Sequence, residues 1–410
     1  MKMNSLEKKW VLYDVGNSAF ILLSTAIIPI YFDSLATKAG VKPADALSYW
    51  GYALSFVTLI VALLSPVLGA ISDMKNMKIK VFGGTLIVGC LGTLLLGLPS
   101  SWIYFLAILI LVKIAFNLSL VIYDAMLVDI TEESRMDVVS SHGFAWGYIG
   151  STIPFIISLI IAMKGKDFGL STQLSFIVIF ALNAIWWFFF TVPLLRSYKQ
   201  VNYLEKRISS SESWKIIKDT LKEIKNDKTI LFFLIAFFFY IDGVNTIINM
   251  AVSYGKSLSL DSTGLLLALL MTQIIAFPCS LIFSRLSRKY ETSLLIKICI
   301  VAYFCITAFA VQLDRLWEFW LLAGLVGMFQ GAIQALSRSF FSKIIPADES
   351  GKYFGVYDIC GKGASLVGTL SVATMTKLTG KQSLGIIALP FFFIIGYIFF
   401  DKSVKHSKKK

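Results

Sequence analysis

Twelve apolar stretches of about twenty residues follow one another along this chain, with short polar connections between them. An α-helix needs about that length of apolar sequence to cross the hydrocarbon core of a bilayer. Hydrophobic residues make up 57% of the chain and charged residues 15%, whereas a soluble domain carries about 25% charged residues. We therefore predict an all-α membrane protein whose transmembrane helices lie at residues 10–32, 46–71, 81–99, 102–127, 144–163, 172–195, 229–251, 263–284, 292–312, 317–337, 353–376 and 382–400.

Lysine and arginine are distributed unevenly among the connections. If the N-terminus is placed in the cytoplasm, the segments on that side hold 27 of the 38 Lys and Arg residues, and those on the other side hold 8. Cytoplasmic loops of membrane proteins carry such an excess. The pattern predicts that both termini are cytoplasmic. It also explains the net charge of +13 by the basic residues that orient the protein in the membrane and contact anionic lipid headgroups, rather than by binding of nucleic acid.

The longest polar stretch, residues 196–228, divides the chain into two sets of six predicted helices. We expect a six-helix bundle at 1–195, a cytoplasmic linker at 196–228, a second bundle at 229–400 and a basic cytoplasmic tail at 401–410. In the linker, a Ser209-x-x-Glu212 capping box precedes apolar residues at three- and four-residue steps from Trp214 to Ile224, opposite four lysines. This amphipathic helix lies on the inner membrane surface or packs on the bundle, and the sequence leaves both open.

The two halves share a short pattern in their first predicted helices. Asp14, Asn17 and Ser18 follow the pattern D-x-x-N-[S/T], and so do Asp242, Asn245 and Thr246. Internal repeats are typical of transporters in which two bundles rock about a central site. The pattern favours a pseudo-symmetric pair of bundles.

A motif lies between the second and third predicted helices. Gly69 and Asp73, followed by Lys75, Lys78 and Lys80, resemble the G-x-x-x-D-[RK]-x-G-[RK]-[RK] signature of the major facilitator superfamily, although Met74 and Asn76 depart from it. The resemblance implies the twelve-helix fold of that superfamily. It also implies a latch for one conformation, in which Gly69 permits close helix packing and Asp73 and Lys78 provide paired charges.

Five further stretches resemble the vacuole-effluxer-like branch of the superfamily in its bacterial form. The fungal members of that branch export amino acids from the vacuole during autophagy, so the resemblance implies an amino-acid cargo. For a bacterial member it implies the cytoplasmic (inner) membrane. The stretches are Trp10 to Phe20, Ser140 to Gly150, Asp242 to Gly255, Gln330 to Pro346 and Tyr353 to Ser365.

Polar residues form stripes at helical spacing on the first, fourth, seventh and tenth predicted helices. These four helices line the central cavity in the superfamily that the chain resembles. Ionisable and amide groups at membrane depth mark binding sites or ion pathways, and the alternative role of the amides is hydrogen bonding between helices. The predicted substrate-binding or coupling residues are Asp14, Asn17, Lys113, Asn117, Asp242, Asn245, Asn249, Gln330 and Gln334.

Other charged residues in the predicted helices have simpler interpretations. Asp358 and Lys362 are four residues apart on one helix, which predicts a structural ion pair. Asp124 lies near the end of its helix, where it either caps and pairs with loop residues or belongs to the site. The sequence leaves both roles open for Asp124.

The mixture of acids, amides and a lysine suits a zwitterion with an apolar or aromatic side chain. We expect its carboxylate at Lys113 and its ammonium group at Asp242 or Asp14. Since burial raises the pKa of a carboxyl group toward neutrality, transport coupled to protons is also consistent with the sequence. The expected function is secondary active or facilitative transport of amino acids by alternating access.

Several other classes are disfavoured by the residue inventory. There are two histidines, and the five cysteines lack metal-ligand spacing, so we expect no metal, no cofactor and no enzymatic activity. The remaining alternatives are a transporter of a lipid, drug or sugar, and a non-transporting sensor or scaffold on the same fold. We expect a monomer whose partners are a small-molecule substrate, protons and the lipid bilayer, with no nucleic acid.

Overall fold

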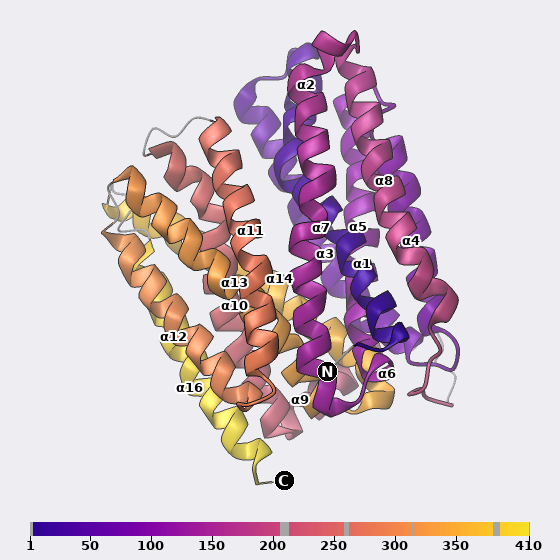
Figure 1. The fold of residues 1–410 in the computed structure, drawn as a ribbon, viewed down its shortest axis with the longest axis vertical. Helices are drawn as coiled ribbons and strands as arrows, with labels where there is room; N and C mark the ends of the chain where they lie inside the picture. Colours follow the sequence, from indigo (N-terminus) through magenta and orange to yellow (C-terminus); the bar gives the residue numbers. More distant parts are fainter. Residues whose placement is uncertain (1–2, 206–212, 258–261, 313–314, 380–385, 410) are drawn as a thin grey trace.

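The computed structural model describes residues 3–205, 213–257, 262–312, 315–379 and 386–409. Figure 1 shows their helices gathered into two bundles that lean against each other. The first bundle (indigo to magenta) contains α1 (Ser5–Leu22), the π-helical turn η1 (Leu23–Ile27), α2 (Ile28–Lys38), α3 (Pro43–Ser72), α4 (Lys78–Leu95), α5 (Trp102–Ala125), α6 (Leu127–Ile130), η2 (Glu133–Arg135), α7 (Met136–Lys164), η3 (Gly165–Phe168) and α8 (Thr172–Ser197).

The second bundle follows the linker helix and repeats the same number of long helices. α1 packs on α7 and α8 in the first bundle, and α10 packs on α14 and α16 in the second. The elements after the first bundle are α9 (Ser213–Asn226), α10 (Lys228–Ser257), α11 (Ser262–Leu286), α12 (Thr292–Val311), α13 (Leu316–Ile344), η5 (Ala347–Glu349), α14 (Ser350–Thr379), η6 (Ile386–Ala388) and α16 (Leu389–Ser407).

The all-α membrane class is confirmed. In the described part of the chain, eleven helical stretches are long and apolar enough to cross a membrane, and the remaining predicted span, 353–376, lies within the 30-residue helix α14.

Six predicted boundaries were wrong by more than four residues. The first span runs from Ser5 to Lys38 rather than from 10 to 32, and α7 begins at Met136 rather than 144. α10 continues to Ser257 rather than 251, α13 to Ile344 rather than 337 and α16 to Ser407 rather than 400. The predicted start of the last span, at 382, lies outside the described residues. The added turns of α7 and α13 carry polar residues such as Asp137 and Ser339, which hydrogen-bond to each other across the bundles. Hydropathy does not detect such turns, because tertiary contacts satisfy their polar groups.

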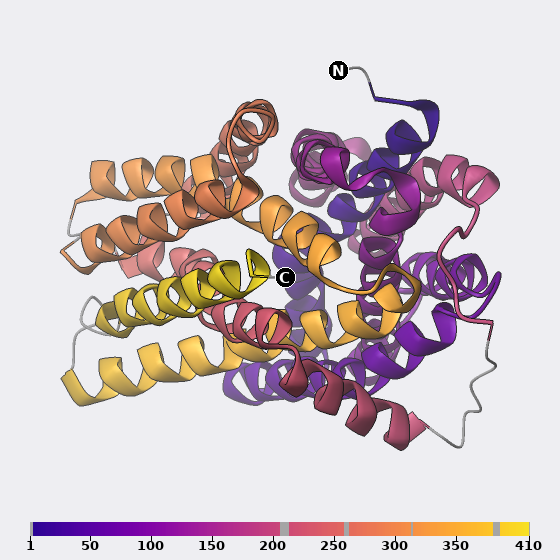
Figure 2. The same cartoon turned by 90° about the horizontal axis from the view of Figure 1, so that it is seen from below.

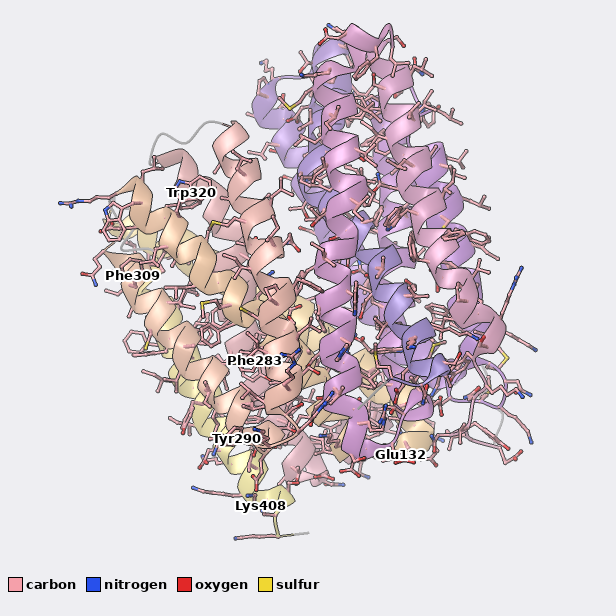
Figure 3. All side chains as sticks on the ribbon, viewed as in Figure 1. Glu132, Phe283, Tyr290, Phe309, Trp320 and Lys408 are labelled. Atoms are coloured by element: carbon pink, nitrogen blue, oxygen red, sulfur yellow. The ribbon has the colours of Figure 1, made fainter. Side chains whose placement is uncertain are left out.

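Both chain termini lie at the same end of the molecule, at the bottom of Figure 1, and we call it the termini end. Figure 3 shows Glu132 and Tyr290 at this end, one on each bundle, and Trp320 near the opposite end of the second bundle. Figure 2 views the termini end and shows α9 lying across it.

Polar contacts close the two bundles against each other at the termini end. The Ser140 hydroxyl donates to the Ala335 carbonyl at 2.7 Å, and Lys343 Nζ lies 2.6 Å from a carboxylate oxygen of Asp137. Ser350 Oγ donates to the Ala125 carbonyl at 3.1 Å. These residues belong to the ends of α5, α7, α13 and α14 that are nearest the termini, so the described structure is closed at this end.

The crossing of α3 and α14 brings their backbones into direct contact. A Cβ atom on Gly69 would overlap the carbonyl of Gly351, and a Cβ atom on Gly355 would overlap the backbone of Pro66. Glycine is required at such a crossing because any side chain would force the helices apart. The backbone contact between α3 and α14 is therefore one of the contacts that close the termini end.

The linker helix α9 packs on the bundles. It contacts α3 and α10, it buries Thr220 and Ile224, and its Glu223 lies 2.7 Å from Lys352 Nζ of α14. Leu221, on the predicted apolar face, is 52% exposed. The contacts favour the packed alternative, and the predicted capping box lies outside the described residues.

The glycine contact generates a prediction for the closed end. Leucine at Gly69 should separate α3 from α14, since overpacking a tight contact costs about 1–3 kcal/mol, which corresponds to about a 5- to 150-fold lower ratio of closed to open molecules. The measurement is the distance between spin labels on cysteines at Glu132 and Tyr290. Gly84→Leu is the control, because nothing lies within 4 Å of a Cβ atom at Gly84, and equal distances in both variants would contradict the prediction.

Candidate functional site: the cavity between the bundles

A central cavity of about 370 Å³ lies between the bundles and is lined by α1, α5 and α7 of the first and by α10, α11, α13 and α14 of the second. A volume in this range suits a small organic solute. Phe237, Ile241 and Ile248 provide apolar walls. The polar and tyrosine side chains of the lining are those of Asp14, Asn17, Ser18, Asp124, Tyr148, Ser151, Asn245, Gln273, Gln330, Gln334, Arg338, Tyr357, Asp358 and Lys362.

Arg338 of α13 forms ion pairs across the floor of this cavity. Its Nη1 lies 2.9 Å from Asp124 Oδ1 of α5 and its Nη2 lies 3.5 Å from Asp14 Oδ2 of α1. Nε donates to Ser140 Oγ at 2.9 Å, and Nη2 donates to the Ser140 carbonyl at 3.1 Å. The side chain of Arg338 is 3% exposed. A second-bundle cation is thus held almost entirely by groups of the first bundle.

Aromatic rings surround the Arg338 guanidinium. Its central carbon lies 4.7 Å from the ring centroid of Trp10 and 4.5 Å from that of Phe144, distances at which a cation is attracted to the face of a ring. The hydroxyl of Tyr123 donates to Asp14 Oδ2 at 2.8 Å. These contacts fix the orientation of the arginine and of one of its carboxylate partners.

A second ion pair lies in the wall of the cavity. Asp358 and Lys362 of α14 pair with each other, as the spacing predicts. Ser65 of α3 also donates to Asp358 across the bundles at 3.3 Å. Both charged residues line the cavity, so this pair adjoins the space available to a solute.

The predicted residues fall into two groups. Asp14, Asn17, Asn245, Gln330 and Gln334 line the central cavity together. The described cavity lining does not include Lys113, Asn117 or Asp242. The side chain of Asn249 lies outside the described residues.

Lys113 and Asn117 lie on the same helical face as Leu120 and Asp124, which do line the cavity. They are seven or more residues from Asp124, toward the opposite end, and a helix rises about 1.5 Å per residue. The Asn117 amide donates to the Lys113 carbonyl at 2.7 Å within the helix. Arg338, rather than Lys113, is therefore the cation beside Asp14.

Asp242 faces α14 instead of the cavity. It is fully buried, and its Oδ1 accepts hydrogen bonds from Thr246 Oγ1 and from the Gly368 backbone N–H, both at 3.1 Å. These contacts join α10 to α14 within the second bundle. The geometry is that of a helix–helix contact.

A one-residue difference between the halves explains why Asp14 and Asp242 face different ways. The Tyr13 hydroxyl bonds Ser119 on α5, and the Tyr240 hydroxyl bonds Ser337 on α13, each at 2.7 Å. The structural repeat is therefore anchored on the tyrosines, and it pairs Asp14 with Ile241, a residue that also lines the cavity. Asp242 is one residue further along, which turns it by about 100° around the helix.

Sequence reasoning omitted Arg338 from the predicted site and left Asp124 undecided. The signal for Arg338 was present, because it lies four residues after Gln334 and eight after Gln330 on one stripe. Ser18 and Tyr148 also line the cavity. Ser18 belongs to the D-x-x-N-[S/T] pattern of the first predicted helix, whereas the only signal for Tyr148 was its place in the stretch from Ser140 to Gly150.

The residues of the predicted latch meet at the termini end. Asp73 accepts hydrogen bonds from the backbone N–H groups of Gly351 and Lys352 at 2.8 and 2.9 Å, which lie in the first turn of α14 and have no acceptor within the helix. Burial raises the pKa of Asp73 to about 7, although Lys78 and the two N–H groups act to lower it. Lys78 Nζ lies 3.2 Å from Asp129 Oδ2 and 3.0 Å from Ser350 Oγ.

The fold resembles solved structures over nearly its whole length. The transporter FucP in the outward conformation superposes with a TM-score of 0.75 at 11% identity, covering 97% of this chain and 98% of that one. The human organic anion transporter MFSD10 gives 0.73 at 13% identity, with 97% and 99% covered. At such low identity, these matches establish the fold, which is that of the major facilitator superfamily.

Similar sequences identify the family. An MFS-type transporter of Bacillus subtilis (strain 168), YxiO, is 40% identical over 398 residues, which cover 96% of this chain and 93% of that protein. Autophagy-related protein 22 of Kluyveromyces lactis is 23% identical, with 89% and 80% covered. The family model described as "Vacuole effluxer Atg22 like" matches residues 6–410. The chain therefore belongs to the Atg22-like vacuole effluxer family of major facilitator superfamily transporters.

Proposed function

We propose that this transporter moves amino acids with apolar or aromatic side chains across the bacterial cytoplasmic membrane by alternating access. The observation that carries the proposal is the central cavity, in which Arg338 and the carboxylates Asp14 and Asp124 stand next to apolar walls. The carboxylate of a zwitterion can pair with Arg338, and its ammonium group can pair with Asp14 and Asp124. An apolar side chain can pack against the walls formed by Phe237 and Ile241. The resemblance to fungal effluxers that export amino acids from the vacuole implies the same class of cargo.

The closed termini end supports an alternating-access cycle. If both termini are cytoplasmic, as the distribution of Lys and Arg indicates, this structure is closed toward the cytoplasm. The cavity would then receive its cargo from the opposite side or release it there. The contacts of Gly69, Asp73 and Lys78 with the start of α14 would act as the latch of this state.

Transport measured in proteoliposomes tests the cargo. Purified protein should accumulate or exchange radiolabelled leucine or phenylalanine faster than empty liposomes do, and glucose should not compete. A pH gradient across the membrane shows whether protons are coupled, because coupled uptake responds to its direction. Failure of all twenty amino acids to be transported or to stabilise the protein against heat would remove the amino-acid assignment.

The cavity amides generate a second prediction. Gln334→Ala removes side-chain donors and acceptors from the cavity lining, and loss of a hydrogen bond to a charged group costs about 1.5–3 kcal/mol. We expect the KM for leucine to rise at least tenfold, because 1.4 kcal/mol corresponds to tenfold. Gln312→Ala is the control, since Gln312 lies at the end of α12, away from the cavity; a similar KM in both variants would place the cargo elsewhere.

The pKa of Asp73 generates a prediction about pH. Because this pKa is about 7 in the closed state, well above the ordinary value near 3.9, the closed state binds a proton more tightly than a state in which Asp73 faces water. The ratio of closed to open molecules should therefore rise about tenfold as the pH falls from 8 to 6, and the stabilisation is lost as the pH rises through 7. Spin-label distances between Glu132 and Tyr290 give the ratio. A rise of the same size in Asp73→Asn would show that another group is responsible.

A further inference from the structure

Arg338 connects the two bundles at the floor of the cavity through opposite charges. The guanidinium belongs to α13 of the second bundle, whereas Asp14 and Asp124 belong to α1 and α5 of the first. Removing one partner from a buried ion pair leaves an uncompensated charge and is strongly destabilising. Any motion that separates the bundles at the termini end must therefore separate these charges.

The described cavity carries more negative than positive charge. Its charged lining residues are three carboxylates, of Asp14, Asp124 and Asp358, and two cations, of Arg338 and Lys362. Asp358 and Lys362 pair with each other on α14, so Arg338 faces two carboxylates. When all five groups are ionised, their net charge is −1. The excess favours an additional positive group near Asp14 and Asp124.

Apart from Arg338, the described groups that hydrogen-bond to these carboxylates are neutral. Tyr123 donates a hydrogen bond to Asp14, and the Asn17 amide donates to Asp14 at 3.3 Å. Trp10 and Phe144 contribute rings that contact Arg338. These groups orient Asp14 and Arg338, but none of them supplies a positive charge to replace that of Arg338.

We propose that the ammonium group of the cargo replaces Arg338 on Asp14 and Asp124, while the carboxylate of the same cargo pairs with Arg338. This exchange rests on the proposed function, whose cargo it defines as a zwitterion recognised by one charge on each bundle. With the zwitterion in place, Arg338 still has an anionic partner, so the bundles close around the cargo at the termini end.

A cargo that lacks its carboxylate has a different effect. A simple amine occupies Asp14 and Asp124 and offers nothing to Arg338. The guanidinium then approaches a site that already carries a cation, and like charges at this separation repel. The amine therefore holds the termini end open, whereas the amino acid permits closure.

The test compares three analogues of one side chain at pH 8. Spin labels are placed on cysteines at Glu132 and Tyr290, which lie on different bundles at the termini end (Figure 3), after the exposed Cys305 is replaced by serine. Isopentylamine, which is leucine without its carboxylate, should shift the distance distribution toward the open state. 4-Methylpentanoate, which lacks the ammonium group, should cause no shift, and L-leucine should cause a smaller shift than isopentylamine.

Variants identify the carboxylates as the site of exchange. Asp14→Asn and Asp124→Asn should each require at least a tenfold higher concentration of isopentylamine for half of the shift. Asp33→Asn is the matched control, because Asp33 is exposed on α2, and it should respond as the wild type does. Arg338→Gln should populate the open state without any probe, and isopentylamine should add little to it.

Two outcomes overturn the exchange. One is the absence of any shift with isopentylamine in the wild type. The other is a shift with isopentylamine in both Asp14→Asn and Asp124→Asn that equals the shift in the wild type. If these two variants do not fold, the same shift in Arg338→Gln overturns the exchange. These outcomes are separate from the fate of the proposed function, because leucine transport without an amine response removes only the exchange, and an amine response without amino-acid transport removes only the cargo.

Discussion

The electrostatic attraction between Arg338 and the carboxylates of Asp14 and Asp124 governs the rest of this structure. Charges are costly away from water, and a buried guanidinium is retained only where anions and hydrogen-bond acceptors surround it. The second bundle supplies the cation and the first supplies the anions, so neither bundle is electrostatically complete alone. This dependence brings the bundles together at the floor of the cavity and gives the cavity polar groups of both signs.

The closed termini end is built from contacts of different physical kinds. Gly69 and Gly351 allow the backbones of α3 and α14 to touch. Asp73 accepts hydrogen bonds from the backbone N–H groups at the start of α14. Glu223 of the linker helix pairs with Lys352 in the same turn of α14. Each contact involves the start of α14 and a partner in the first bundle or the linker. Movement of that one helix end would release all of them together, as expected for a two-state element.

The two bundles are related by a repeat whose register is set by packing. Tyr13 and Tyr240 bond equivalent serines, and Gly16 and Gly243, three residues later, lie against the last helix of their own bundles, α8 and α16. The helices that line the cavity thus have matched orientations. The side chains at equivalent positions differ, since Asp14 corresponds to Ile241. The two carboxylates that pair with Arg338 therefore both lie on the first bundle.

The sequence determined the features that depend on local composition. Apolar stretches specified the membrane helices, the polar stripes of α1 and α13 specified the faces that line the cavity, and the spacing of Asp358 and Lys362 specified their ion pair. Tertiary structure decided which charges meet. Whether Asp242 faces the cavity depends on a rotation of about 100°, which the contact of Tyr240 with Ser337 fixes, and Arg338 finds Asp14 and Asp124 only because two bundles far apart in sequence pack together. The polar turns of α7 and α13 escaped prediction for the same reason, since their partners lie on the other bundle.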